Sequence, residues 1–163
     1  MPLTRVRTGG ITDANVTIAK VANDAKNVPA FHASLSSNQT ISNATETKVN
    51  FDTELFDSDG TYDNSSNYRF TPAVTGKYFI YACMRLNNSD DFNNFHVFIK
   101  KNGSNALMSG RRHTHYGSNL VSGIVDSDTN DYFEAFIYQD TGGNFIVRGQ
   151  AHETYFGGFK ITT

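Results

Sequence analysis

A basic run with two histidines is the segment of this sequence best suited to bind a ligand. It reads Arg111-Arg112-His113-Thr114-His115-Tyr116. In a β-strand, residues two positions apart point to the same face, and imidazole is a good ligand for transition metals. The guanidinium groups could instead contact a carboxylate or a sugar acid. Arg111, Arg112, His113 and His115 are therefore our candidates for residues that face a receptor. The alternative is that this segment is a solvated polar loop without a ligand.

Three aspartates near residue 60 form a second candidate site. Asp57-Ser58-Asp59-Gly60 contains the Asp-x-Asp-Gly fragment of calcium loops, and Asp63 follows it. The later ligand spacing and the bidentate glutamate of a complete calcium loop are missing. The segment 126–131 is a similar acidic turn. Asp57, Asp59 and Asp63 are therefore candidate calcium ligands, with an ordinary Asx-rich turn as the alternative.

The sequence offers no recognisable arrangement for covalent or acid–base catalysis. Its single cysteine, Cys83, lies in the apolar run Tyr78–Met84, which is typical of a small core residue. No serine, histidine and aspartate share a context that indicates a nucleophile. The glutamates that could serve a hydrolase are isolated from one another, namely Glu46, Glu54, Glu134 and Glu153. We expect a protein that binds and assembles, not an enzyme.

The elements that must position these residues are short β-strands. The chain has 163 residues with 13 Phe and 8 Tyr, which favour strands, separated by polar turns such as Asn102-Gly103. About nine or ten strands are expected, which predicts an all-β, ten-stranded sandwich or jelly roll of two sheets. The expected strands are 30–36, 48–56, 68–71, 78–84, 95–100, 120–125, 132–138, 145–147 and 155–161.

Several of these strands are apolar on both faces. A two-layer sandwich buries only one face of each sheet inside the domain. The surplus aromatic residues predict that outer faces meet other subunits. The candidates for core or axial packing in such an assembly are Tyr78, Tyr81, Phe133, Tyr155 and Phe156.

Residues 1–29 differ from the rest of the chain because they contain no aromatic residue. Their sparse aliphatic positions, Ile11, Val16, Ile18 and Val21, cannot form a core alone. We therefore divide the chain into an N-terminal arm for attachment, residues 1–29, and a head domain, residues 30–163. The arm would bury its four aliphatic side chains on a partner.

A set of landmarks in the head carries a family resemblance. They are Ala30-Phe31-His32-Ala33, the series Phe51, Asp57, Tyr62, Phe70, Gly76 and Tyr78, then Lys101-Asn102-Gly103, Asp131-Tyr132-Phe133 and Thr154-Tyr155-Phe156-Gly157-Gly158-Phe159. In order and type they resemble the globular head of the first complement component, in the tumour-necrosis-factor-like jelly-roll superfamily. The resemblance implies a compact homotrimer and a recognition module without an active site. On the three-fold axis of such a trimer, a transition metal held by His113 and His115, or a calcium ion held by oxygen ligands, would be a cofactor.

The arm has a shorter resemblance of its own. Leu3-Thr4-Arg5-Val6, Gly10-Ile11-Thr12-Asp13 and Val16-Thr17 with Ala19-Lys20-Val21-Ala22 look like the openings of bacteriophage fibre and virion-surface proteins. This implies a virion structural protein, a homotrimer attached through its arms to other virion proteins. The head would serve as a tail-fibre tip that recognises a host-surface glycan or protein, or as a capsid decoration. The alternative is a soluble cytokine-like or lectin-like recognition protein of a cell.

Composition narrows the partners and the location. The net charge of -2 lacks the basic excess of nucleic-acid-binding proteins. The sequence has no apolar run of the length of a signal peptide or a membrane span. We expect synthesis in the host cytoplasm without a signal peptide, a place on the virion surface, and no membrane insertion.

Overall fold

Strands make up all the regular structure of the described residues. The computed structural model describes residues 26–87, 92–113 and 117–161, without the side chains of residues 92, 93 and 111–113. Its elements are β1 Ala30–Ser34, β2 Gln39–Ile41, β3 Thr47–Lys48, β4 Thr53–Asp57, β5 Tyr62–Asp63, β6 Arg69–Phe70, β7 Gly76–Arg85, β8 Phe92–Lys101, β9 Ser104–His113, β10 Ser118–Ser127, β11 Phe133–Gln139, β12 Phe145–Val147 and β13 Tyr155–Ile161. No helix in this part of the chain is long and apolar enough to cross a membrane.

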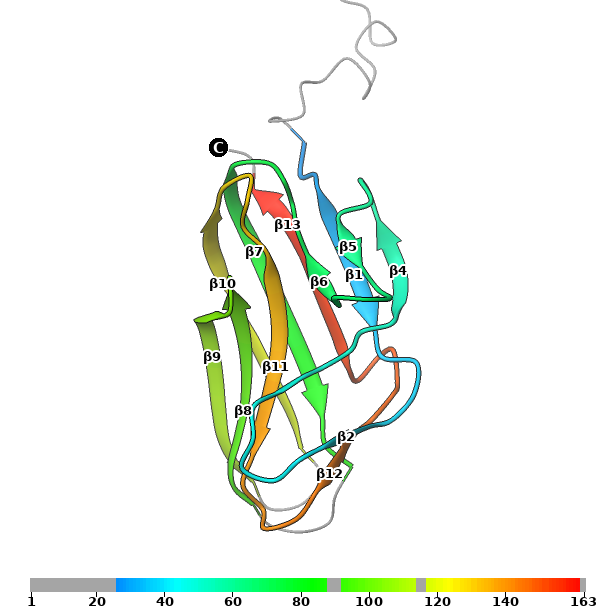
Figure 1. Cartoon of the computed structure of the whole chain (residues 1–163), viewed down its shortest axis with the longest axis vertical. Coiled ribbons are helices and arrows are strands. Elements are labelled where there is room, and N and C mark those ends of the chain that lie inside the picture. Colours follow the sequence, from blue (N-terminus) through cyan, green and yellow to red (C-terminus); the bar gives the residue numbers. More distant parts are fainter. Residues whose placement is uncertain (1–25, 88–91, 114–116, 162–163) are drawn as a thin grey trace, which may run out of the picture.

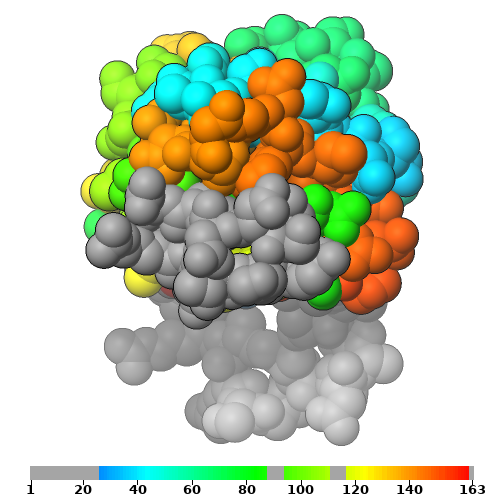
Figure 2. Space-filling model, turned by 90° about the horizontal axis from the view of Figure 1, so that it is seen from below, coloured from blue at the N-terminus to red at the C-terminus, as the bar shows by residue number. Residues whose placement is uncertain are grey.

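Two large sheets stack against each other (Figure 1). One has the order β10-β7-β13-β1-β4, and the other has the order β5-β6-β11-β8-β9 with β3 paired to β11. A two-stranded sheet of β12 and β2 lies at the end of the head opposite the start of β1, where Figure 2 shows residues near 40 beside residues near 145. The all-β jelly-roll prediction is confirmed. The described residues contain thirteen strands, because β2, β5 and β9 were not expected and the predicted strand 48–56 is divided into β3 and β4.

The core forms because the long strands alternate their side chains. On β7, Tyr78, Ile80, Ala82 and Met84 are all buried between the sheets. Phe31 and Ala33 of β1 are buried as well, and so is Leu35 directly after this strand.

Phe31 lies at the centre of the aromatic core. Its ring centroid is 4.3 Å from that of Phe70, 4.8 Å from Tyr62 and 4.9 Å from Phe156. These residues come from strands of both sheets, so the cluster holds the two layers together.

The hairpin between β8 and β9 has the predicted turn. Asn102 and Gly103 have positive φ angles of 51° and 79°, as a two-residue hairpin loop requires. The Asn102 side-chain amide donates to Asp131 Oδ1 at 2.6 Å, and the Tyr132 amide donates to Asn102 Oδ1 at 3.0 Å. The turn is therefore fixed to the segment that precedes β11.

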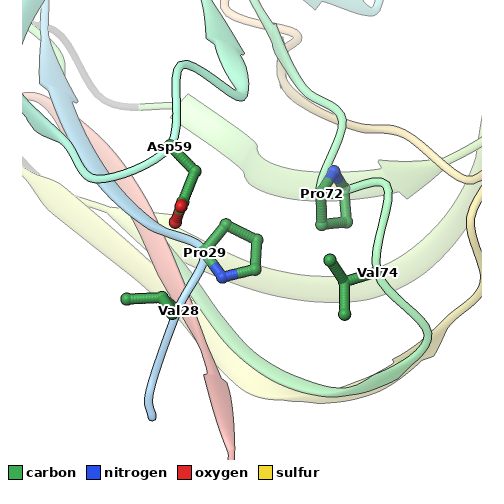
Figure 3. Close-up of a pocket in the computed structure, with 5 residues that line it drawn as sticks. All are labelled: Val28, Pro29, Asp59, Pro72 and Val74. Atoms are coloured by element: carbon green, nitrogen blue, oxygen red, sulfur yellow. The ribbon is translucent and has the colours of Figure 1, made fainter. Parts of the chain in front are cut away.

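The chain enters the head through Val28 and Pro29. Both residues line a small hollow of about 90 Å³ together with Asp59, Pro72 and Val74. Figure 3 shows the Pro29 ring on the side of Pro72 and Val74, while the Val28 side chain points the other way. The carbonyl of Pro29 accepts a hydrogen bond from the Lys160 amide at 3.1 Å. Val28 and Pro29 therefore contact the head, and the division of the chain into arm and head stays a prediction. The arm residues Ile11, Val16, Ile18 and Val21 lie outside the described residues.

Candidate subunit interface

The outer face of the five-stranded sheet carries an aromatic surface. Strand pairing places Tyr81 opposite Gly157, which in turn lies opposite His32, and His32 lies opposite Phe56. A neighbouring row pairs Phe79 with Phe159, and Tyr155 follows on β13. His32, Phe79, Tyr81, Tyr155 and Phe159 alternate with core residues along their strands, so their side chains point away from the core. Phe56 comes from β4, which has no buried residue, and its ring stacks on that of His32. We call the six residues the aromatic face: His32, Phe56, Phe79, Tyr81, Tyr155 and Phe159.

The rings of the aromatic face form one continuous array. The His32 ring centroid is 5.4 Å from Tyr155, 5.8 Å from Tyr81 and 6.2 Å from Phe56. Phe79 lies 5.6 Å from Phe159 and 6.0 Å from Tyr81, which extends the array along β7 and β13. Four strands therefore contribute to a single apolar surface.

Gly157 allows the centre of this array to form. A Cβ atom at this position would collide with the Tyr81 ring, which crosses β13 at this point. Because the position is a glycine, the Tyr81 hydroxyl reaches Nδ1 of His32 at 2.8 Å. The missing side chain therefore lets β7 and β1 make contact across β13.

Burial keeps the centre of the face uncharged. It lowers the pKa of His32 from its usual value of 6.5 and raises the pKa of Tyr81 above 10.0. Both side chains are thus neutral at pH 7. A surface of neutral aromatic groups loses little hydration energy when another protein covers it.

Exposed aliphatic side chains and ion pairs surround the aromatic face. On β10, Leu120 lies opposite Cys83 and Ile124 lies opposite Phe79, with exposures of 52% and 61%. Lys77 pairs with Asp126 at 2.9 Å at one end of β7, and Arg85 pairs with Glu153 at 2.6 Å at the other. An apolar centre with a charged rim is the usual anatomy of a protein interface.

The predicted residues for core or axial packing divide into two groups. Tyr78, Phe133 and Phe156 are fully buried within the head, so they take part in core packing and not in axial packing. Tyr81 and Tyr155 lie on the aromatic face as expected. The alternation along β7 contained the missing signal, because Tyr78 and Tyr81 lie on opposite faces of the strand. Sequence reasoning missed His32, Phe56, Phe79 and Phe159.

The acidic segment near residue 60 is built as two turns. Asp57 accepts hydrogen bonds from the Asp59 and Tyr62 amides, and Asp63 accepts them from the Ser65, Ser66 and Asn67 amides. These bonds lower the pKa of Asp63 far below its usual range. Among the described residues, no three acidic, histidine or cysteine side chains gather as a metal site. The hydrogen bonds of Asp57 and Asp63 are those of Asx-rich turns, and calcium binding by Asp57, Asp59 and Asp63 stays a prediction.

The other predicted site residues are spread over the head. Arg111 and His113 belong to β9, where they lie opposite Phe95 and Phe92 of β8. The side chains of Arg111, Arg112 and His113, and all of His115, lie outside the described residues. Three of the glutamates form ion pairs, Glu46 with Lys100, Glu134 with Lys48 and Glu153 with Arg85.

Comparison with known proteins identifies the class of fold. The two stacked sheets define a tumour-necrosis-factor-like jelly roll. The structure of Eiger TNF from S. frugiperda is similar over 81% of this chain and 91% of that chain, with a TM-score of 0.61 and 13% identity. Murine APRIL at pH 5.0 is similar over 81% of this chain and 98% of that chain, with a TM-score of 0.64 and 14% identity. No family model and no curated protein matches the sequence.

Proposed function

We propose that this chain is a homotrimeric binding and assembly protein whose heads join through the aromatic face. The observation that carries the proposal is the uncharged ring array with the exposed side chains Leu120 and Ile124 beside it. A contiguous apolar surface of this kind marks a protein contact. The tumour-necrosis-factor-like fold supports a closed assembly of three heads, as the sequence resemblance implies.

The proposed place of this trimer is the surface of a bacteriophage virion. The support is the resemblance of the arm to the openings of fibre and virion-surface proteins. Figure 1 shows the chain entering the head at one end, while β2 and β12 lie at the other. Arms at the entry end would attach the trimer to other virion proteins and leave the opposite end free to meet a host-surface glycan or protein. Catalysis has no part in this role.

Removal of the arm tests the virion proposal. Deleting residues 2–25 is expected to leave a folded, trimeric head that is no longer incorporated into particles. Residues 26–29 are kept because Pro29 accepts a hydrogen bond from Lys160 within the head. Each buried aliphatic side chain contributes about 1.5–3 kcal/mol, and three arms act together.

The measurement is the amount of protein in purified particles, compared with its mass in solution. A variant with Ile18→Asp and Val21→Asp should be excluded from particles nearly as strongly. Normal incorporation of the truncated chain would show that the head itself attaches, and the arm would have another role.

Acid is expected to weaken the trimer. Burial within a single head already lowers the pKa of His32 below that of the unfolded chain. Covering the aromatic face in the proposed trimer would bury His32 further, so the separated head and the unfolded chain bind this proton at a higher pH than the trimer does. The stability due to neutral His32 is complete above pH 6.5 and is lost as the pH falls from there through the lowered pKa. Mass measured in solution from pH 8 to pH 5 should reveal dissociation, and His32→Gln should reduce this pH dependence. An unchanged dependence in His32→Gln would assign the effect to other groups.

A further inference from the structure

A polar groove on the head shares no lining residue with the aromatic face. It has a volume of about 340 Å³ and lies between the loops that join β1 to β2, β3 to β4 and β5 to β6. All of its lining residues except Leu35 have polar side chains. The side chains that could contact a ligand through hydrogen bonds or a ring are Asn38, Asn50, Asp52 and Tyr68. This volume is within the range of small-molecule sites.

Hydrogen bonds between the loops hold the walls of the groove in place. Asp52 accepts bonds from the Ser36 amide at 2.8 Å and from the Ser36 hydroxyl at 2.6 Å. Asn38 Oδ1 accepts a bond from the Gly149 amide at 3.0 Å. The Asn50 amide donates to Gln39 Oε1 at 2.9 Å. A preformed site of this kind binds a ligand with little loss of loop entropy.

The groove presents three kinds of chemical group toward a ligand. Burial alone would raise the pKa of Asp52, but its hydrogen bonds from Ser36 lower it, so the carboxylate stays ionised and accepts hydrogen bonds. The side-chain amides of Asn38 and Asn50 can donate. Tyr68 adds an aromatic ring and is held at a positive φ of 49°, a conformation that is rare for a bulky residue.

We infer that this groove binds a neutral sugar residue. Each hydroxyl of a sugar both donates and accepts, so neighbouring hydroxyls match a carboxylate and an amide together. The apolar face of the sugar ring suits the Tyr68 ring. None of the lining residues is cationic, and Asp52 repels an anionic ligand. This inference rests on the proposed recognition role of the head and names its ligand class.

The test is a titration of the purified full chain with glucose, galactose, N-acetylglucosamine and glucuronic acid, followed by nuclear magnetic resonance. At least one neutral sugar should bind with a Kd on the order of millimolar, as expected for a ligand of this size. Tyr68→Ala should weaken binding about tenfold because a ring contact is lost. Asn50→Ala, at an exposed position, should weaken it several-fold without affecting the fold.

A second groove provides the matched control. It is lined by Glu46, His96, Phe98, Met108 and Tyr138, so Tyr138→Ala removes a comparable ring from another site. That variant should bind the sugar normally. Absence of binding by all three neutral sugars, tighter binding of glucuronic acid, or a loss confined to Tyr138→Ala would overturn the inference. The titration needs no particles, so its failure is distinct from a failure of the arm-deletion experiment.

Discussion

Replacing Ile124 by aspartate is expected to separate the trimer into single folded heads. Ile124 is 61% exposed within one head, so the head alone tolerates a charge at this position. In the proposed trimer, each subunit would bury that carboxylate beside Phe79 without a partner. An uncompensated buried charge costs about 3–5 kcal/mol, and the three subunits introduce it three times. Light scattering should show a fall in mass from three chains to one.

Met108→Asp is the matched control for this experiment. Met108 is 59% exposed on β9, at the edge of the other large sheet. The two variants have the same change in charge at nearly the same exposure, so they differ mainly in which sheet they occupy. Met108→Asp should remain a trimer. If it dissociates and Ile124→Asp does not, the subunits meet through the six-stranded sheet instead.

Replacing Phe31 by alanine is expected to cause the largest loss of stability in the head. Phe31 is 1% exposed and its ring contacts Phe70, Tyr62 and Phe156. Truncation of a buried phenylalanine lowers the free energy of unfolding by about 3–5 kcal/mol, because contacts are lost and a cavity remains. The measurement is denaturant unfolding in the Ile124→Asp background, so that assembly does not contribute.

Phe56→Ala in the same background shows whether burial causes this loss. Phe56 is 54% exposed in a single head, and its removal should cost about 1 kcal/mol. In the trimer, by contrast, Phe56→Ala should weaken assembly. Equal losses for Phe31 and Phe56 in the single head would contradict the assignment of the two rings to opposite faces of the sheet.

The sequence by itself determined the fold class and many of the strands. The predicted strands 145–147 and 155–161 have the same bounds as β12 and β13. Both follow polar turns and have aromatic or β-branched residues, which are strong local signals. The Asn102-Gly103 turn was equally clear, because few residue pairs adopt its positive φ angles.

Local signals were weaker where strand pairing decides the structure. The predicted strand 48–56 is divided between β3 and β4. The connection between these two strands contains Val49 and Phe51, and both side chains are buried in the core. Alternating apolar positions therefore also occur in a connection that crosses the core. β9 was missed because it has few β-branched or aromatic residues, and its strand conformation comes from pairing with β8.

The tertiary structure alone decided which aromatic residues form a surface. Tyr78-Phe79-Ile80-Tyr81 is apolar at every position, so its period shows which residues share a face but not which face is covered. The second sheet covers Tyr78 and leaves Phe79 and Tyr81 outside. His32 joins these two residues only because β1 lies beside β13 and Gly157 has no side chain between them. Contacts between residues so far apart in the chain arise from sheet order, which local sequence patterns do not encode.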